Sequence, residues 1–179
     1  GLGIPYRDEA PVEPAARGQA VVARAQAAGL RVLCEPGRVI AGNAGVLLTR
    51  VVGLKSNGDK HFVLVDAAMN DLLRPALYGA WHTIEPVRDR GLPRRRVDVV
   101  GPVCESGDFL AKDRELPEVD AGDLLAVRGA GAYGFSMAST YNSRPRAAEV
   151  LVDGDRWQVI RERETVEELW RGEHLLRAP

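Results

Sequence analysis

From residue 42 onward, the sequence repeats one pattern: short apolar runs rich in Val, Leu and Thr alternate with turn-forming residues. Such runs predict strands, and two of the intervening turns, residues 56–59 (SNGD) and 153–155 (DGD), are typical of tight β-hairpins. The predicted strands cover residues 44–54, 61–65, 81–87, 96–103, 123–128, 147–152 and 157–161. Strands at this spacing indicate an antiparallel β-barrel or sandwich, so we predict a mostly β fold.

The first 41 residues follow a different pattern. Val21, Val22 and Ala25 recur at helical spacing and predict a helix over residues 12–28, with Gly29 suited to the position just after its end. Residues 31–34 (RVLC) predict a short buried strand that leads into the turn 35–38 (EPGR). We therefore divide the chain into an α/β segment, residues 1–41, and a β domain, residues 42–179. The capping box 165–168 (TVEE) predicts a short helix near the end of the β domain.

Composition argues against several classes of protein and site. The 179 residues include 24 basic and 25 acidic side chains, and a net charge of −1 gives no reason to expect nucleic acid or an anionic membrane as partner. No apolar run approaches the roughly 20 residues of a membrane span, and no signal peptide opens the sequence. The two cysteines form no CxxC pair, and the three histidines lack ligand spacing. We expect a cytoplasmic protein without a metal site.

Two candidate sites lie in the α/β segment. Backbone N–H groups at the turn containing Gly1 and Gly3 can approach a phosphate closely, although a glycine pair by itself more often forms only a turn. Glu35 and Arg38 follow the predicted strand. A carboxylate there can keep a ring nitrogen protonated, and an arginine can bind phosphate or carboxylate. A surface ion pair beside a Pro-Gly turn is the alternative.

Three further candidates lie in the β domain. Cys104 directly follows a predicted strand and lies beside acidic residues, which should favour the protonated thiol and a role as proton donor. A buried structural cysteine is the alternative, and Cys34 in its apolar run fits that alternative. Tyr133 is flanked by glycines that would let its phenol reach a ligand, unless it only packs within a flexible loop. Arg74 and Tyr78 are four residues apart and share a helical face, for which exposure to solvent is the ordinary explanation.

Five motifs, taken in this order, resemble one known family. They are GLGIPY at 1–6, EPGR at 35–38, DLLRPALYGAWH at 71–82, GPVCESGD at 101–108 and GAYGFSMASTYNSRP at 131–145. Over essentially its whole length the chain is similar to the C-terminal half of the diaminopimelate decarboxylases, which are pyridoxal 5′-phosphate (PLP) enzymes of the alanine-racemase-like fold. The resemblance implies that residues 1–41 are the last β/α segment of a TIM-type barrel and that the rest of this N-terminal barrel is missing.

The resemblance also implies an activity and a set of site residues. The activity would be the conversion of meso-2,6-diaminopimelate to L-lysine and CO2 in lysine biosynthesis, by a homodimer with shared active sites. Cys104 would be the catalytic proton donor to the decarboxylated α-carbon. The cofactor-binding residues would be Gly1, Gly3, Glu35, Gly37, Arg38 and Tyr133. The substrate-binding residues would be Arg38, Arg74, Tyr78, Glu105 and Tyr133.

One feature departs from the family pattern. The lysine that binds the cofactor lies far upstream in the family's barrel, and none of Lys55, Lys60 and Lys112 occurs in a matching motif. We therefore expect the chain alone to be inactive. A related PLP decarboxylase of ornithine, arginine or carboxynorspermidine is the nearest alternative, although Glu105 directly after Cys104 favours diaminopimelate. A non-catalytic dimerisation module is the alternative from another class.

Overall fold

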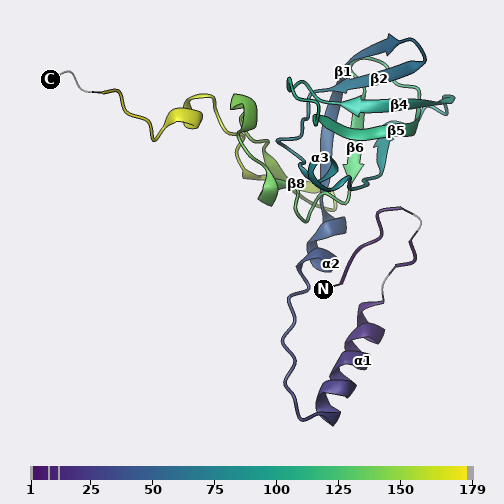
Figure 1. The fold of residues 1–179 in the computed structure, drawn as a ribbon, viewed down its shortest axis with the longest axis vertical. Coiled ribbons are helices and arrows are strands. Elements are labelled where there is room, and N and C mark those ends of the chain that lie inside the picture. The colour runs from purple at the N-terminus through teal and green to yellow at the C-terminus, as the bar shows by residue number, and fades with distance from the viewer. Residues whose placement is uncertain (1, 8, 12, 177–179) are drawn as a thin grey trace.

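The computed structural model describes residues 2–7, 9–11 and 13–176, and the strands outnumber the helices (Figure 1). The α-helices are α1 (Pro14–Ala27), α2 (Gly37–Ala41) and α3 (Arg74–Tyr78). The strands are β1 (Val46–Asn57), β2 (Lys60–Val65), β3 (Ile84–Pro86), β4 (Arg94–Val100), β5 (Phe109–Pro117), β6 (Leu124–Arg128), β7 (Glu149–Asp153) and β8 (Arg156–Arg161). Four short 3-10 turns cover Gly42–Ala44, Phe135–Met137, Tyr141–Ser143 and Glu167–Trp170. The prediction of a mostly β fold is confirmed.

Six strands form one curved sheet in the order β3-β6-β1-β2-β4-β5. The outer strands β3 and β5 contact each other, so the sheet curls into a nearly closed barrel. Its pairs are antiparallel except for β2 and β4, which run parallel with Phe62 opposite Asp98. The expectation of a wholly antiparallel sheet is therefore wrong at this pair. Parallel neighbours need a long crossover, and the segment between β2 and β4, which contains α3 and β3, supplies it.

The barrel interior is the hydrophobic core of the chain. It is filled by apolar side chains from β1, β2, β4, β5 and β6, among which Val65, Val99, Leu110, Leu125 and Val127 are almost completely buried. The sequence pattern did not predict β5, because residues 112–115 are all charged. Asp113 has a left-handed backbone with φ of 49° at a register shift of the β4–β5 ladder, which disturbs the alternation expected of a strand.

Helix α1 and residues 30–36 lie apart from the barrel (Figure 1), whereas Tyr6, nearer the N-terminus, contacts it. Helix α1 buries none of its residues, and it ends in a Schellman motif, in which Gly29 has φ of 66° and the Leu30 N–H donates to the Ala25 carbonyl. Residues 30–36 form no strand, so the strand predicted at 31–34 is not observed. A strand requires ladder partners, and among the described residues this segment has none. Cys34 is accordingly exposed, and its predicted burial is wrong.

The last two strands form a hairpin of their own. β7 and β8 pair across the turn at Gly154, as predicted, but they make a separate two-stranded sheet. Its apolar side chains, including Leu151 and Trp157, are exposed. The predicted capping box is present in one half, since the Thr165 N–H donates to the Glu168 carboxylate over 2.8 Å. Among the described residues, no helix is long and apolar enough to cross a membrane.

A backbone contact without side chains joins the end of β6 to the segment before β1. The Ala130 N–H donates to the Gly45 carbonyl over 2.9 Å, and the Gly131 N–H donates to the Gly42 carbonyl over 3.1 Å. A Cβ atom on Gly131 would lie 1.9 Å from the Ala41 carbonyl oxygen and 2.7 Å from the Gly45 nitrogen. Both neighbours are backbone atoms, so the approach requires glycine. We call this the glycine contact.

Replacing Gly131 by Ala should therefore destabilise the fold. Backbone must move to admit the methyl group, so we expect a loss of about 1–3 kcal/mol in the free energy of unfolding. Gly53→Ala is the matched control, because a Cβ atom there meets nothing within 4 Å. Urea unfolding of both variants measures the difference. Equal midpoints for the two variants would show that the glycine contact is not tightly packed.

Candidate functional site

The glycine contact places Tyr133 beside the start of α2. The guanidinium carbon of Arg38 lies 5.1 Å from the centre of the Tyr133 ring, within the range of a cation–π contact. Tyr133 has φ of 60°, a left-handed conformation that is costly for a residue with a Cβ atom. The residue nevertheless remains 43% exposed. A strained, exposed aromatic side chain held against an arginine is typical of a ligand site rather than of a packed core.

The other residues predicted to bind the cofactor are Gly1, Gly3, Glu35 and Gly37, and only the last two lie close to Arg38 in the sequence. Gly37 begins α2 next to Arg38, and Glu35 is exposed two residues before it. A Cβ atom on Gly3 would meet nothing within 4 Å, so no close approach is formed there. Gly1 lies outside the described residues. The first half-site thus consists of Glu35, Gly37, Arg38 and Tyr133.

Cys104 and Glu105 lie on a second exposed loop, residues 101–108, that a buried carboxylate holds in place. Asp108 is buried, and its two oxygens accept the N–H groups of Val103 over 2.6 Å and of Met69 over 2.7 Å. Both Cys104 and Glu105 are exposed, so Cys104 is not the buried structural cysteine of the alternative interpretation. The GPVCESGD motif therefore builds a fixed loop that presents a thiol and a carboxylate to solvent.

The loop that follows Tyr133 is fixed to the same region by Asn70. This side chain is buried; its amide donates to the Ser139 carbonyl over 3.1 Å and accepts from Arg144 Nε over 3.0 Å. The phenol of Tyr141, on this loop, donates a long hydrogen bond of 3.4 Å to the Glu105 carboxylate. The second half-site thus consists of Cys104, Glu105 and Tyr141. Sequence reasoning did not select Asn70 or Tyr141.

Arg74 and Tyr78 differ in environment although both lie on α3. Arg74 is only 7% exposed, so the ordinary alternative, a solvent-exposed face, does not hold for it. Its Nη1 lies 3.0 Å from Nε2 of His82, and its guanidinium carbon lies 4.7 Å from the centre of the Tyr6 ring. Tyr78 is 65% exposed. Sequence reasoning also did not select His82, which lies within the predicted strand 81–87.

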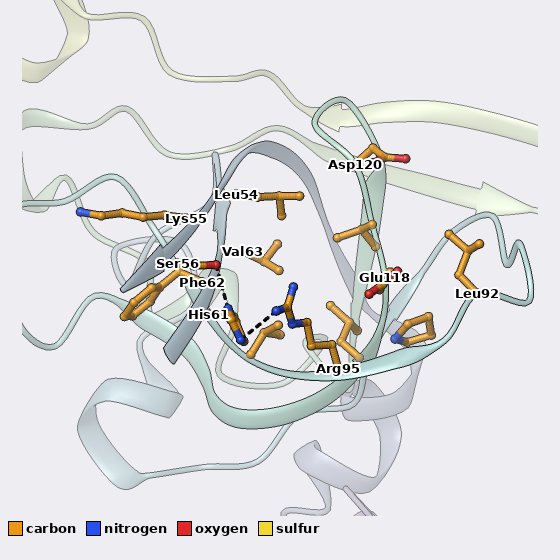
Figure 2. A pocket seen from close by; sticks show the side chains of 14 residues that line it. Leu54, Lys55, Ser56, His61, Phe62, Val63, Leu92, Arg95, Glu118 and Asp120 are labelled. Atoms are coloured by element: carbon orange, nitrogen blue, oxygen red, sulfur yellow. Dashed lines mark hydrogen bonds between the residues drawn. The ribbon is translucent and has the colours of Figure 1, made fainter. Parts of the chain in front are cut away.

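The barrel also carries a pocket of about 300 Å³ at the β1–β2 hairpin (Figure 2). In it Ser56 Oγ lies 2.7 Å from His61 Nδ1, and Arg95 Nη2 lies 2.9 Å from His61 Nε2. Because arginine can only donate, Nε2 must accept and Nδ1 must carry the proton. The imidazole therefore donates to Ser56 and does not act as its base. Ser56, His61 and Arg95 therefore do not form the arrangement in which a histidine base activates a serine nucleophile.

The first half-site has the chemistry to hold one face of PLP. A carboxylate suits the pyridine nitrogen, and a guanidinium and a phenol suit the phosphate and the ring. The lysines of the chain are engaged elsewhere or lie at a hairpin: Lys60 pairs with Asp98 over 2.9 Å, and Lys112 lies 4.0 Å from the Phe109 ring centre. Within the described part of the chain, no hydrogen bond, ion pair or cation–π contact joins the two half-sites.

The chain is similar to known proteins over nearly its whole length. Residues 19–131 match the family model of the pyridoxal-dependent decarboxylase C-terminal sheet domain. A diaminopimelate decarboxylase of Pseudomonas aeruginosa is 58% identical over 98% of this chain and 42% of its own length. The crystal structure of diaminopimelate decarboxylase from Helicobacter pylori complexed with L-lysine matches with a TM-score of 0.88 and 45% identity, over 96% of this chain and 42% of that one.

A more distant match shows how far the similarity extends. The crystal structure of lysine/ornithine decarboxylase from Vibrio vulnificus, complexed with cadaverine, is 25% identical with a TM-score of 0.70, over 82% of this chain and 40% of that one. The chain spans about 42% of the length of the Pseudomonas aeruginosa relative. The sheet-domain match covers more than half of the chain, so the chain belongs to the family of pyridoxal-dependent decarboxylases, of which it carries the C-terminal sheet domain.

Proposed function

We propose that the protein containing this chain decarboxylates meso-2,6-diaminopimelate to L-lysine and CO2, in lysine biosynthesis. The observation that carries the proposal is the 58% identity to a diaminopimelate decarboxylase over 98% of the chain. The two half-sites support it, because together they offer a carboxylate, guanidinium groups, phenols and a thiol on fixed loops. In this proposal residues 1–41 complete an upstream barrel and residues 42–179 form the β domain. The presence of only two cysteines supports a cytoplasmic setting.

PLP is the cofactor of this proposal. When bound, it supplies an electron-accepting pyridine ring that makes loss of CO2 from an α-amino acid possible. Glu35 keeps the ring nitrogen protonated through its carboxylate. Arg38 and Tyr133 bind the cofactor and the adjoining part of the substrate. The lysine that anchors the cofactor comes from outside this chain.

The end of the substrate that does not react distinguishes diaminopimelate from simpler diamino acids. It carries an ammonium and a carboxylate, so it requires an acidic and a basic partner. Glu105 supplies the carboxylate for the ammonium, and Arg74 with Tyr78 binds the carboxylate. Ornithine lacks the distal carboxylate and would leave a buried arginine unpaired, which disfavours it. The lower identity to the lysine/ornithine enzyme, 25%, points the same way.

Cys104 donates the proton that replaces the lost CO2. Its exposed Sγ–H can reach the α-carbon of a substrate only if that substrate lies over the 101–108 loop. We infer that Cys104 and Glu105 complete the half-site of Arg38 and Tyr133 on a second subunit, in a homodimer with shared active sites. The absence of a contact between the half-sites within the described residues supports this arrangement.

The experiment that tests the function is an assay of the full-length protein with PLP. Release of CO2 and formation of L-lysine from meso-diaminopimelate should exceed turnover of ornithine, arginine and carboxynorspermidine by at least about a hundredfold in kcat/KM, since a missing carboxylate leaves polar groups unpaired. Faster turnover of ornithine would overturn the substrate assignment. No turnover of any of these, with PLP bound, would favour the non-catalytic dimerisation module.

Glu105→Gln tests the contact with the distal ammonium. The amide keeps the shape of the side chain but removes its charge, so KM for diaminopimelate should rise about tenfold, in line with the loss of a charged hydrogen bond. Glu115→Gln is the control, because Glu115 is an exposed glutamate of β5 on the opposite end of its strand from this loop. Equal KM values for Glu105→Gln and the parent protein would remove Glu105 from the site.

Cys104→Ala tests proton donation and the shared site together. Loss of a general acid lowers turnover by on the order of 10²–10⁴-fold, while PLP should still bind, because Cys104 does not contact it. Mixed dimers of Cys104→Ala with a variant lacking the barrel lysine should regain activity, since one of their two sites has both groups. Mixed dimers that form but stay as inactive as either parent would contradict the shared site. Cys34→Ala serves as the control.

A further inference from the structure

We propose that His82 is a positioning residue: its neutral imidazole fixes the guanidinium of Arg74 in the orientation that binds the distal carboxylate of the substrate. The inference rests on the proposed function, which gives Arg74 that role. His82 itself is completely buried and lies behind Arg74, so it acts through the arginine.

Both ring nitrogens of His82 are engaged, and their partners fix the proton. Nε2 lies 3.0 Å from Arg74 Nη1, and Nδ1 lies 2.9 Å from the Arg128 carbonyl oxygen at the end of β6. A guanidinium has only donors and a carbonyl has only acceptors. Nε2 therefore accepts from Arg74, and Nδ1 carries the hydrogen that Arg128 accepts. Only the neutral imidazole with its proton on Nδ1 satisfies both contacts.

The position of the imidazole is fixed by elements on several sides. Arg114 of β5 donates from Nη1 to the His82 carbonyl over 2.6 Å, and its guanidinium carbon lies 3.2 Å from the Trp81 ring centre. Tyr6 packs edge-on against the His82 ring at 5.3 Å. The ring therefore cannot turn away from Arg74 without breaking its contacts to the Arg128 carbonyl of β6 and to Tyr6, and Arg114 fixes the backbone that carries it.

The surroundings of His82 also keep it uncharged. Among the described residues, the charged groups that face it are the guanidinium groups of Arg74 and Arg114, and the phenol of Tyr6 is a further titratable group. Burial, helped by these two cations, lowers the pKa of His82 below its usual 6.5, although its hydrogen bond to the Arg128 carbonyl opposes the shift. The neutral form thus contributes stability that is present above pH 6.5 and is lost as the pH falls through the lowered pKa.

Protonation would reverse the contact with Arg74. An imidazolium donates from both nitrogens, so Nε2 would oppose the guanidinium instead of accepting from it. Arg74 would then lose its fixed orientation as the pH falls through the pKa of His82. We expect the affinity for diaminopimelate to weaken at low pH for this reason, with little change in kcat.

Two substitutions in the full-length protein separate the two hydrogen bonds of His82. His82→Asn keeps a donor for the Arg128 carbonyl but has no acceptor at the position of Nε2. His82→Gln places its amide oxygen at that position. KM for diaminopimelate should rise about tenfold in His82→Asn, as expected when a buried donor loses its acceptor. In His82→Gln, KM for diaminopimelate should stay within about threefold of the parent value. In both variants kcat should change little.

His61→Asn is the matched control. His61 makes the same pair of contacts, with a hydroxyl at Nδ1 and an arginine at Nε2, but at the pocket of the β1–β2 hairpin (Figure 2). Its substitution should leave KM unchanged. The parent protein should show a rise in KM at low pH that His82→Gln, which cannot be protonated there, lacks.

A second readout does not depend on turnover. ¹⁵N NMR of the full-length protein should show His82 neutral, with its proton on Nδ1, down to a pH below 6.5, and calorimetry should show weaker L-lysine binding in His82→Asn.

Equal rises in KM for His82→Asn and His82→Gln, or an unchanged KM with only a lower melting temperature, would overturn the positioning role. A charged His82 at neutral pH would do the same. A protein that does not turn over diaminopimelate refutes the proposed function, while the NMR result still decides the pairing of His82 with Arg74.

Discussion

The site depends on a place where two stretches of backbone touch with no side chain between them. The carbonyl of Ala41 and the nitrogen of Gly45 lie where the Cβ atom of any residue other than glycine at position 131 would be. This contact ties the loop after β6 to the turn before β1. It also decides where Tyr133 lies, because Tyr133 is only two positions after Gly131 in the sequence. The left-handed backbone of Tyr133 is sustained by that constraint rather than by its own preference.

The remaining polar residues of the site are fixed by buried groups that do no chemistry themselves. Asp108 holds the Cys104 loop through two backbone N–H groups, and Asn70 holds the loop that carries Tyr141. His82 does the same for Arg74 through a side-chain contact. In each case the buried polar side chain is hydrogen-bonded to other parts of the protein, and these hydrogen bonds restrict the motion of the loop or side chain that it holds. Cys104, Glu105 and Tyr133 themselves remain exposed, which fits the proposal that a second subunit completes the site.

The sequence predicted those parts of the fold that local signals determine. The two hairpins and the end of α1 at Gly29 follow from turn and capping chemistry. Contacts with distant residues determine what it could not predict. Among the described residues, the strand expected at 31–34 has no neighbouring strand to pair with. In β5, four consecutive charged residues interrupt the alternation of apolar and polar residues that would have predicted a strand. The parallel pairing of β2 with β4 depends on how the intervening segment crosses the barrel. The candidate site residues were proposed from family motifs, whereas the burial of Arg74 and its pairing with His82 required the folded structure.

The most direct test of this account is a crystal structure of the full-length protein with PLP and L-lysine bound. The account predicts that a single lysine is surrounded by Arg38 and Tyr133 from one subunit and by Cys104 and Glu105 from the other. It also predicts that Arg74 still donates to Nε2 of His82, as in this chain. A lysine that contacts groups of only one subunit, or that lies beyond hydrogen-bonding distance of both Cys104 and Glu105, would contradict the division of the site into two halves.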